Sequence, residues 1–259
     1  MDILDKIIAY KREEVAVRKL LTPAGELKQS IYFERTCLSL KQNLLKENST
    51  GIIAEFKRKS PSKGFINQHA DVAQVTKDYT FYGASGLSIL TDHHFFGGDT
   101  QDLVQARVNN IPILRKDFII DPYQILAAKA MGADVILLIA ACLSVTEVKE
   151  LAAYAKQTGL EVLLELHDEN ELLHICNDVD MVGINNRNLK TFRVDLNRSI
   201  QLSKLISASK IKIAESGIDN FQTVKRFKDA GYKGFLIGET FMKETNPGHA
   251  FKKFVTEIK

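Results

Sequence analysis

The chain has 259 residues, of which 45% are hydrophobic and 26% are charged, a composition that excludes a disordered or fibrous protein. Its net charge of +3 is too small for a nucleic-acid binder and fits a small anionic ligand better. The three cysteines form no CxxC pair, and no apolar run approaches the roughly 20 residues of a membrane helix. We therefore expect a cytoplasmic globular protein with no nucleic-acid or membrane partner.

The first fifty residues have the pattern of helices. A first helix is indicated by apolar residues that recur at helical spacing, namely Ile3, Leu4, Ile7 and Ile8. Residues 11–14 (KREE) on this helix are expected to form a solvated charged face. A second helix is predicted over about residues 32–46.

From residue 51 onward, short aliphatic runs alternate with longer amphipathic stretches, which is typical of repeated βα units and a parallel sheet. Eight such runs occur, at residues 51–57, 86–92, 111–116, 134–140, 160–165, 181–185, 210–215 and 234–238. Their ends recur about every 26 residues, which suits a strand, a helix and two short loops.

Eight parallel strands close a barrel, and such barrels need about 250 residues. We therefore predict one domain over residues 1–259, a (β/α)8 TIM barrel at 51–259 with an N-terminal helical extension at 1–50. The alternative is an open doubly wound sheet, but no GxGxxG turn follows an early strand.

Ionisable and polar residues end several of the predicted strands, where the active site of such a barrel lies. Because side chains alternate along a strand, Glu55 and Lys57 face the same way. Further runs end in Lys116, Glu165, Asn185 and Glu215. Burying the five charged groups costs several kcal/mol apiece unless they are paired, so the cluster is not expected to stabilise the fold. It predicts an acid–base site instead. For any single residue, a solvated or structural charge is the alternative.

Glycine follows the seventh and eighth runs, in AESGI (214–218) and LIGE (236–239). Glycine lets backbone N–H groups approach an anion, and the loops after these two strands form the recurring phosphate site of the fold. Gly217, Gly238 and the N–H of Glu239 are therefore candidates, although a single strand-end glycine can also serve a plain turn.

The segment IIAEFKRKSPSKG (52–64) closely resembles the first-strand motif of the indole-3-glycerol phosphate synthases, barrel enzymes that close the indole ring in tryptophan biosynthesis. The resemblance covers essentially the full chain, because ILDKIIAYKREEVA is similar to that family's extra helix. Further matching motifs are LTDHHFFGG (90–98), ILRKDF (113–118), LLELH (163–167), GINNRNL (183–189), IAESGI (213–218) and LIGETFM (236–242).

This resemblance implies a carboxy-lyase that acts on 1-(2-carboxyphenylamino)-1-deoxyribulose 5-phosphate. Ring closure, decarboxylation and dehydration would give indole-3-glycerol phosphate without a cofactor or metal. Lys116 would be the main general acid, with catalytic partners Glu55, Lys57 and Glu165. Which of Lys57, Lys116 and Glu165 serves the dehydration step stays open.

The resemblance also implies which residues bind each part of the substrate. Asn185 and Glu215 would position the sugar portion, and Phe96 and Phe118 would bound the aromatic end. The sugar-phosphate end would be lined by Ser60, Arg187, Ser216, Gly217 and Gly238. Glu239 stands where the family often has a small polar residue, so we expect it to bind phosphate only through its backbone N–H.

Two other functions are open to this sequence. A different sugar-phosphate enzyme, such as a phosphoribosylanthranilate isomerase, would share the glycine loops but has no reason to carry both EFKRKSPSKG and RKDF. A non-catalytic phosphosugar-binding protein would be expected to have lost members of the acid–base cluster. The adjacent His93 and His94 have no partner spaced to complete a metal site, and the sequence identifies no partner enzyme.

Overall fold

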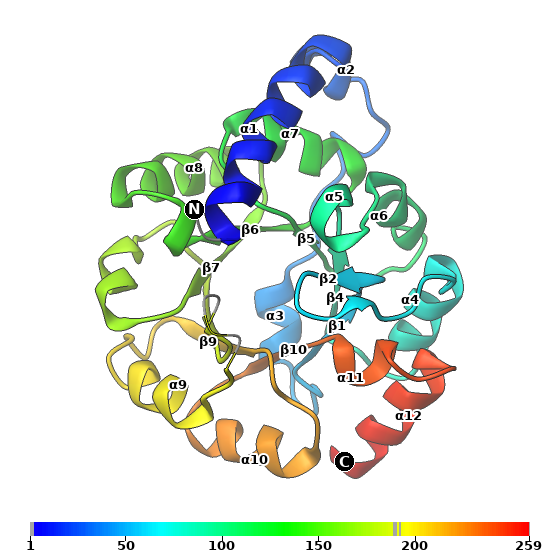
Figure 1. Ribbon diagram of the computed structural model, residues 1–259, viewed down its shortest axis with the longest axis vertical. Coiled ribbons are helices and arrows are strands. Elements are labelled where there is room, and N and C mark those ends of the chain that lie inside the picture. The colour runs from blue at the N-terminus through cyan, green and yellow to red at the C-terminus, as the bar shows by residue number, and fades with distance from the viewer. Residues whose placement is uncertain (1–2, 189–190, 192, 259) are drawn as a thin grey trace.

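The computed structural model, which describes residues 3–188, 191 and 193–258, contains eight parallel strands closed into a barrel (Figure 1). The strands are β1 (Ile52–Phe56), β4 (Gly86–Leu90), β5 (Ile113–Lys116), β6 (Val135–Ile139), β7 (Glu161–Leu166), β8 (Met181–Asn185), β9 (Ile211–Glu215) and β10 (Gly234–Ile237). Around the barrel they follow the order β1-β10-β9-β8-β7-β6-β5-β4, with β4 paired to β1. The predicted (β/α)8 barrel is confirmed, and each expected run contains one strand.

Helices surround the strands on the outside of the barrel (Figure 1). They are α4 (Val72–Phe81), α6 (Thr100–Ala106), α7 (Pro122–Met131), α8 (Val145–Gln157), α9 (Leu196–Ser203), α10 (Phe221–Asp229) and α12 (Pro247–Ile258). Most of them begin where a side chain accepts a backbone N–H, at Asp71, Asp99, Asp121, Ser144, Asp195 and Asn220. None of the helices in the described residues is long and apolar enough to cross a bilayer.

Shorter elements occupy the loops that follow the strands. Between β7 and β8 the connection is a 3-10 helix rather than an α-helix. These elements are the hairpin of β2 (Lys59–Ser60) and β3 (Gly64–Phe65), α5 (His93–Phe96), η1 (Ala140–Cys142), η2 (Glu169–His174) and α11 (Glu239–Met242). Apart from η2, they place extra residues at the carboxyl ends of β1, β4, β6 and β10.

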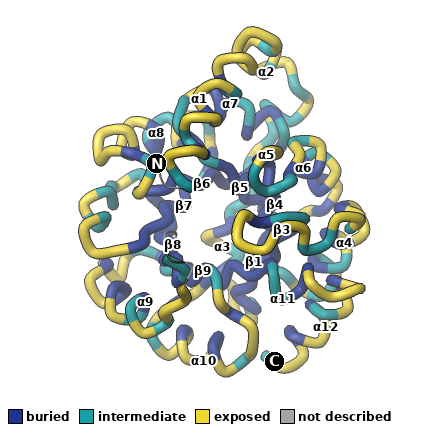
Figure 2. The backbone as a smooth tube through the Cα atoms, in the orientation of Figure 1, coloured by how far each residue is buried: buried dark blue, intermediate teal, exposed yellow. Residues whose placement is uncertain are grey.

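The core has two layers, one inside the barrel and one between the strands and the helices. Because side chains alternate, Ile53 packs in the inner cluster while Ile52 and Ala54 pack in the outer one. Figure 2 shows that the strands are mostly buried, in dark blue. The short helix α3 (Leu40–Leu45) closes the amino end of the barrel with Leu40 and Leu44, which belong to the inner cluster.

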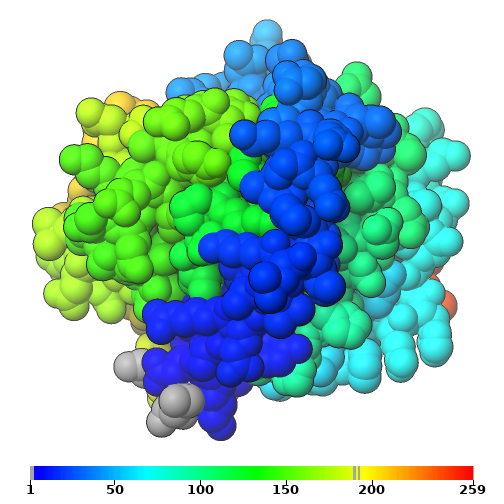
Figure 3. Space-filling model, turned by 90° about the horizontal axis from the view of Figure 1, so that it is seen from above, coloured from blue at the N-terminus to red at the C-terminus, as the bar shows by residue number. Residues whose placement is uncertain are grey.

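The N-terminal segment crosses the outside of the barrel between its two ends. It begins with α1 (Ile3–Leu21) at the carboxyl ends of the strands, continues through α2 (Ala24–Leu27) and reaches α3 at the opposite end. Figure 3 shows this segment, in blue, lying across one face of the molecule.

The expected solvated face at residues 11–14 is wrong for Lys11, whose side chain is only 1% exposed. Its Nζ lies 2.9 Å from Asp92 Oδ2 and 3.0 Å from Asp117 Oδ1, and 2.8 Å from Glu14 Oε2. A buried carboxylate needs a cationic partner, and Lys11 serves two of them at the carboxyl ends of β4 and β5. Arg12 and Glu13 are exposed as expected.

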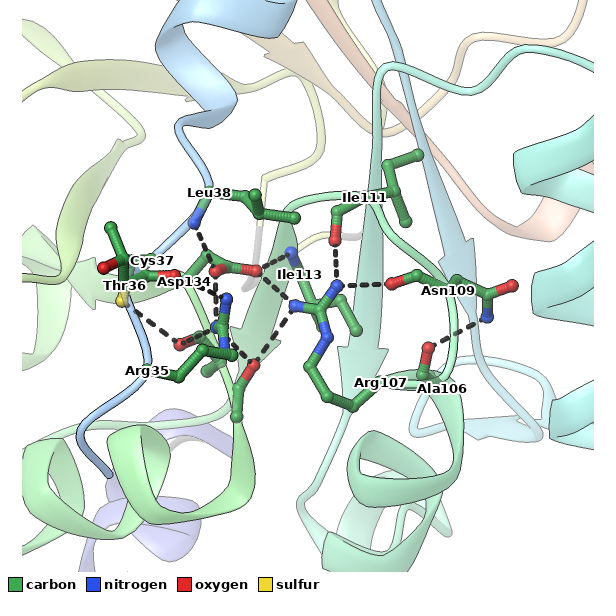
Figure 4. A network of polar contacts seen from close by, with 12 residues as sticks. Arg35, Thr36, Cys37, Leu38, Ala106, Arg107, Asn109, Ile111, Ile113 and Asp134 are labelled. Carbon is green, nitrogen blue, oxygen red and sulfur yellow. Dashed lines mark hydrogen bonds and ion pairs between the residues drawn. The ribbon is translucent and has the colours of Figure 1, made fainter. Parts of the chain in front are cut away.

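The helix predicted over residues 32–46 is wrong in its first half, because residues 36–39 have no regular structure. The backbone N–H of Leu38 donates to Asp134 Oδ1 (2.7 Å), and Arg35 donates to the same oxygen (2.6 Å; Figure 4). These contacts hold the segment extended against the barrel. The helix begins only after Ser39, whose side chain accepts the N–H of Gln42 (3.0 Å).

Candidate active site

A cavity of about 450 Å³ opens at the carboxyl ends of the strands. All fourteen residues that the sequence analysis assigned to the site line it: Glu55, Lys57, Ser60, Phe96, Lys116, Phe118, Glu165, Asn185, Arg187, Glu215, Ser216, Gly217, Gly238 and Glu239. These residues come from strand ends and loops around the barrel, and they lie close together because the sheet is closed.

Lys116, at the end of β5, reaches across the barrel toward two buried glutamates. Its Nζ lies 3.3 Å from Glu165 Oε2 and 4.0 Å from Glu215 Oε2. Asn185 Nδ2 donates to the other oxygen of Glu165 (3.0 Å). The Glu165 carboxylate is therefore fixed at both oxygens.

A second ion pair lies in the same cavity, at the carboxyl end of β1. Lys57 Nζ is 2.6 Å from Glu55 Oε1, and both side chains face the cavity as their alternation predicted. Glu55 is buried, whereas Lys57 is partly exposed. The cavity therefore contains a lysine–carboxylate pair at the end of β1 as well as the one formed by Lys116 and Glu165.

Burial and charge together decide which of these groups is ionised. Burial opposes the charge on Lys116, but Glu165, Glu215 and Glu55 outweigh it and raise the pKa of Lys116. Burial also opposes ionisation of Glu165, yet Lys116 and His167 hold its pKa below the usual range. Burial and the nearby Glu165 charge raise the pKa of Glu215 well above the ordinary value. At neutral pH we expect Lys116 charged, Glu165 ionised and Glu215 protonated.

Two glycines make room for these carboxylates. Gly183 on β8 is paired with Glu165 on β7 and with Ile213 on β9, and a Cβ added to Gly183 would collide with Glu215 Oε1. A Cβ on Gly238 would lie 2.5 Å from Glu55 Oε1. A side chain at Gly238 would therefore displace Glu55 as well as narrow the cavity beside it.

The part of the cavity wall that follows β8, β9 and β10 contains the cation Arg187 and the glycine-containing segments after β9 and β10, with Lys63 close by. Ser216 and Gly217, after β9, both have positive φ values, 68° and 67°. Arg187 Nη2 lies 3.6 Å from Glu239 Oε2, and Lys63 Nζ lies 2.6 Å from Glu239 Oε1. These cations lower the pKa of Glu239 despite its partial burial. Lys63, in the loop after β1, was not expected in the site.

The third wall is aromatic and aliphatic. The rings of Phe96 and Phe118 lie 5.9 Å apart between centroids. Ile3, Leu4 and Ile7 of α1 also line the cavity, which the sequence analysis missed. Their helical spacing was visible, but nothing in it indicated that the apolar face would cover the barrel mouth.

The buried Lys11 supports the two aromatic residues through its carboxylate partners. Asp92 accepts the N–H groups of Phe95 and Phe96 at the start of α5 (2.9 and 3.3 Å). Asp117 accepts the N–H of Phe118 (2.8 Å). One ion-pair cluster therefore joins α1 to the backbone of both rings.

Comparison with known proteins agrees with this geometry. The family model described as indole-3-glycerol phosphate synthase matches residues 4–254. The chain is 48% identical over 258 residues to a protein of that name from Bacteroides thetaiotaomicron, covering 99% of both chains. It is 42% identical over 256 residues to another from Burkholderia vietnamiensis, covering 97% of this chain and 98% of the relative. The chain belongs to the indole-3-glycerol phosphate synthase family.

A distant likeness shows the fold alone. The 3-hexulose-6-phosphate synthase from Salmonella typhimurium superposes with a TM-score of 0.61 at 13% identity, over 81% of this chain and 100% of that one. The motifs by which the sequence resembles the indole-3-glycerol phosphate synthase family surround the cavity, except that Leu189 of GINNRNL lies outside the described residues.

In this member of the indole-3-glycerol phosphate synthase family, His93 and His94 contact other residues of the fold. His93 Nδ1 is 3.2 Å from the carbonyl oxygen of Gly98, and His94 stacks on Tyr10 with ring centroids 4.4 Å apart. Within residues 3–188, 191 and 193–258, no group of three or more His, Cys, Asp or Glu side chains is placed to hold a metal ion.

Proposed function

We propose that the protein converts 1-(2-carboxyphenylamino)-1-deoxyribulose 5-phosphate into indole-3-glycerol phosphate, the indole-forming step of tryptophan biosynthesis. The observation that carries this proposal is the placement of Lys116 Nζ within 3.3 Å of Glu165 inside a cavity that also has an aromatic wall and an anion-binding wall. Membership of the family supports it.

We propose that the substrate lies across the cavity with its two ends on opposite walls. The phosphate would accept hydrogen bonds from the backbone around Gly217 and Gly238 and from the guanidinium of Arg187, which suits an anion. The aromatic ring would pack against Phe96 and Phe118. Its sugar portion would then pass over Asn185 and Glu215, beside Lys116.

In this pose the ring carbon that bears the carboxylate attacks the C2′ carbonyl carbon, and negative charge develops on the carbonyl oxygen. Lys116 donates a proton to that oxygen, forming the C2′ hydroxyl. The bond between the ring and its carboxylate then breaks, releasing carbon dioxide. Glu165 keeps Lys116 charged before the transfer, because the ion pair stabilises the ammonium form.

Dehydration needs an acid for the leaving C2′ hydroxyl and a base for the remaining proton. We assign these roles to Lys57 and Glu55, which form the second ion pair of the cavity at 2.6 Å. Each step is a proton transfer or the loss of carbon dioxide or water, so the reaction needs no redox cofactor or electron sink.

The test is to mix purified protein with the carboxyphenylamino substrate and a metal chelator and to follow indole fluorescence. We expect fluorescence to rise, with turnover independent of added metal. No rise in fluorescence, or turnover of phosphoribosylanthranilate instead, would overturn the proposal.

A further inference from the structure

His167 lies directly behind the acid–base cluster, at the point where β7 ends. Its side chain is about 10% exposed. One ring nitrogen, Nε2, lies 3.2 Å from Glu165 Oε1, and the other, Nδ1, lies 3.6 Å from Glu171 Oε2. The same oxygen of Glu171 accepts the backbone N–H of His167 (2.5 Å), which fixes Glu171 against the ring.

This imidazole sits between two carboxylates, so its environment favours the charged form. Burial lowers the pKa of His167, but Glu165 and Glu171 outweigh burial and raise the pKa to about 10. Neither ring nitrogen makes a well-aligned hydrogen bond among the described residues. The imidazole and the Glu165 carboxylate therefore lie 3.2 Å apart without an aligned hydrogen bond between them.

The charged groups around Glu165 come from several elements. Lys116 of β5 contacts one carboxylate oxygen, whereas His167, directly after β7, and Asn185 of β8 contact the other. Glu215 of β9 competes for Lys116, and the Glu55–Lys57 pair of β1 completes the cluster. Two neighbouring carboxyl groups thus share the cation Lys116, while His167 contacts only Glu165 of the two.

We propose that His167 is a positioning residue that carries a permanent positive charge and keeps Glu165 ionised, so that Glu215, the other carboxyl group in contact with Lys116, is the one that holds a proton. Two carboxyl groups a few ångströms apart resist being ionised together, because their charges repel. A cation beside one of them stabilises its ionised form, so the other group keeps the proton. Without it, Glu165 and Glu215 would compete for the proton on more equal terms.

This inference rests on the proposed function only in its second test, which measures a reaction rate. Its first test uses the wild-type protein without substrate, with isotope-labelled histidine and glutamate followed by NMR between pH 5 and pH 9. We expect the His167 imidazole to stay protonated up to pH 8. The Glu165 carboxyl should be ionised and the Glu215 carboxyl protonated at pH 7. An imidazole that loses its proton below pH 8, or a protonated Glu165, would overturn the proposal.

The second test compares His167→Gln with His174→Gln. His174 lies in the same connection, but its ring contacts backbone carbonyl oxygens of Glu171 and Leu143 (both 3.0 Å). Loss of the cation beside Glu165 raises the carboxyl pKa. The acid limb of the kcat/KM profile should therefore move to higher pH by about one unit or more in His167→Gln. We expect the limb to stay in place in His174→Gln.

An unmoved acid limb in a folded His167→Gln protein would contradict the proposal. If that variant does not fold, the wild-type titration still decides it. If the wild-type protein does not turn over the substrate, the proposed function is wrong. The NMR titration still tests the role of His167, because it uses no substrate.

Discussion

Lys116 is the only cation within 4.0 Å of both buried glutamates among the described ion pairs, so a neutral side chain there removes two interactions at once. We expect Lys116→Met to lower kcat by about 100-fold or more, the usual scale for a positioned acid. Steady-state turnover measures this, with circular dichroism as the control for folding. Turnover close to that of the wild type would remove Lys116 from the acid role.

The opposite pKa shifts of the two glutamates predict different responses to the same substitution. Glutamine resembles a protonated carboxyl group, which is the expected state of Glu215 and not of Glu165. We therefore expect Glu165→Gln to lower kcat at pH 7 about tenfold more than Glu215→Gln does. Equal losses in parallel kinetic measurements would mean that the proton does not reside on Glu215.

Arg187 tests the position of the phosphate. A charge-assisted hydrogen bond contributes about 1.5 to 3 kcal/mol, so Arg187→Met should weaken binding of inorganic phosphate about tenfold or more. Glu165→Gln should leave phosphate affinity intact while lowering turnover. Calorimetric titration of both variants decides this: equal losses of affinity would mean that the ends of the site are misassigned.

Residue types at strand ends were predictable because a barrel brings every carboxyl end to one mouth. Lys57 and Glu165 could be placed there from the chain alone. His167 and Ile7 could not, because their roles depend on contacts between segments that no spacing rule connects. For Gly238, the sequence indicated a backbone donor but not the closeness of Glu55.

Among the elements, α1 is held to the barrel by two lysines whose ion pairs differ in burial. Lys11 is buried between Asp92 and Asp117, whereas Lys19 meets Asp121 at 2.6 Å on the exposed side. Breaking a buried pair costs about 3 to 5 kcal/mol, whereas an exposed pair contributes about 0 to 1 kcal/mol. We expect Lys11→Met to lower the free energy of unfolding by about 3 kcal/mol or more.

Lys19→Met is the matched control, with an expected loss below about 1 kcal/mol. Denaturant unfolding of both variants measures the difference. Similar losses would show that Lys11 is not the main anchor of α1.

The misplaced second helix shows where local pattern gives way to tertiary contact. Residues 32–46 contain enough helix-forming residues to suggest one helix, but the Leu38 N–H and the Arg35 side chain instead bind Asp134 (Figure 4). A distant carboxylate is invisible to a periodicity argument. The first helix was predictable because Ile3, Leu4, Ile7 and Ile8 recur at helical spacing.

Across the whole molecule, we expect the amino end of the barrel to stabilise the fold and the carboxyl end to carry the chemistry. Asp134 lies at the amino end, where it binds Arg35 and Arg107 and accepts the N–H groups of Leu38 and Ile113. We expect Asp134→Asn to lower the free energy of unfolding by about 3 kcal/mol with kcat within about twofold of the wild type. Thermal unfolding and turnover measure the two effects, and a large loss of kcat would contradict this separation.

The barrel was predictable because its repeat is long and regular, and eight runs use the available length. The register between its strands could not be predicted from the sequence. Register pairs Gly183 with Glu165, and the missing side chain of Gly183 leaves the space that Glu215 fills from the next strand. A side chain gained at position 183 would therefore meet the carboxyl group of Glu215. In any descendant of this sequence, a side chain gained at position 183 should be accompanied by a shorter residue at position 215, and the acid–base chemistry would have to be redistributed with it.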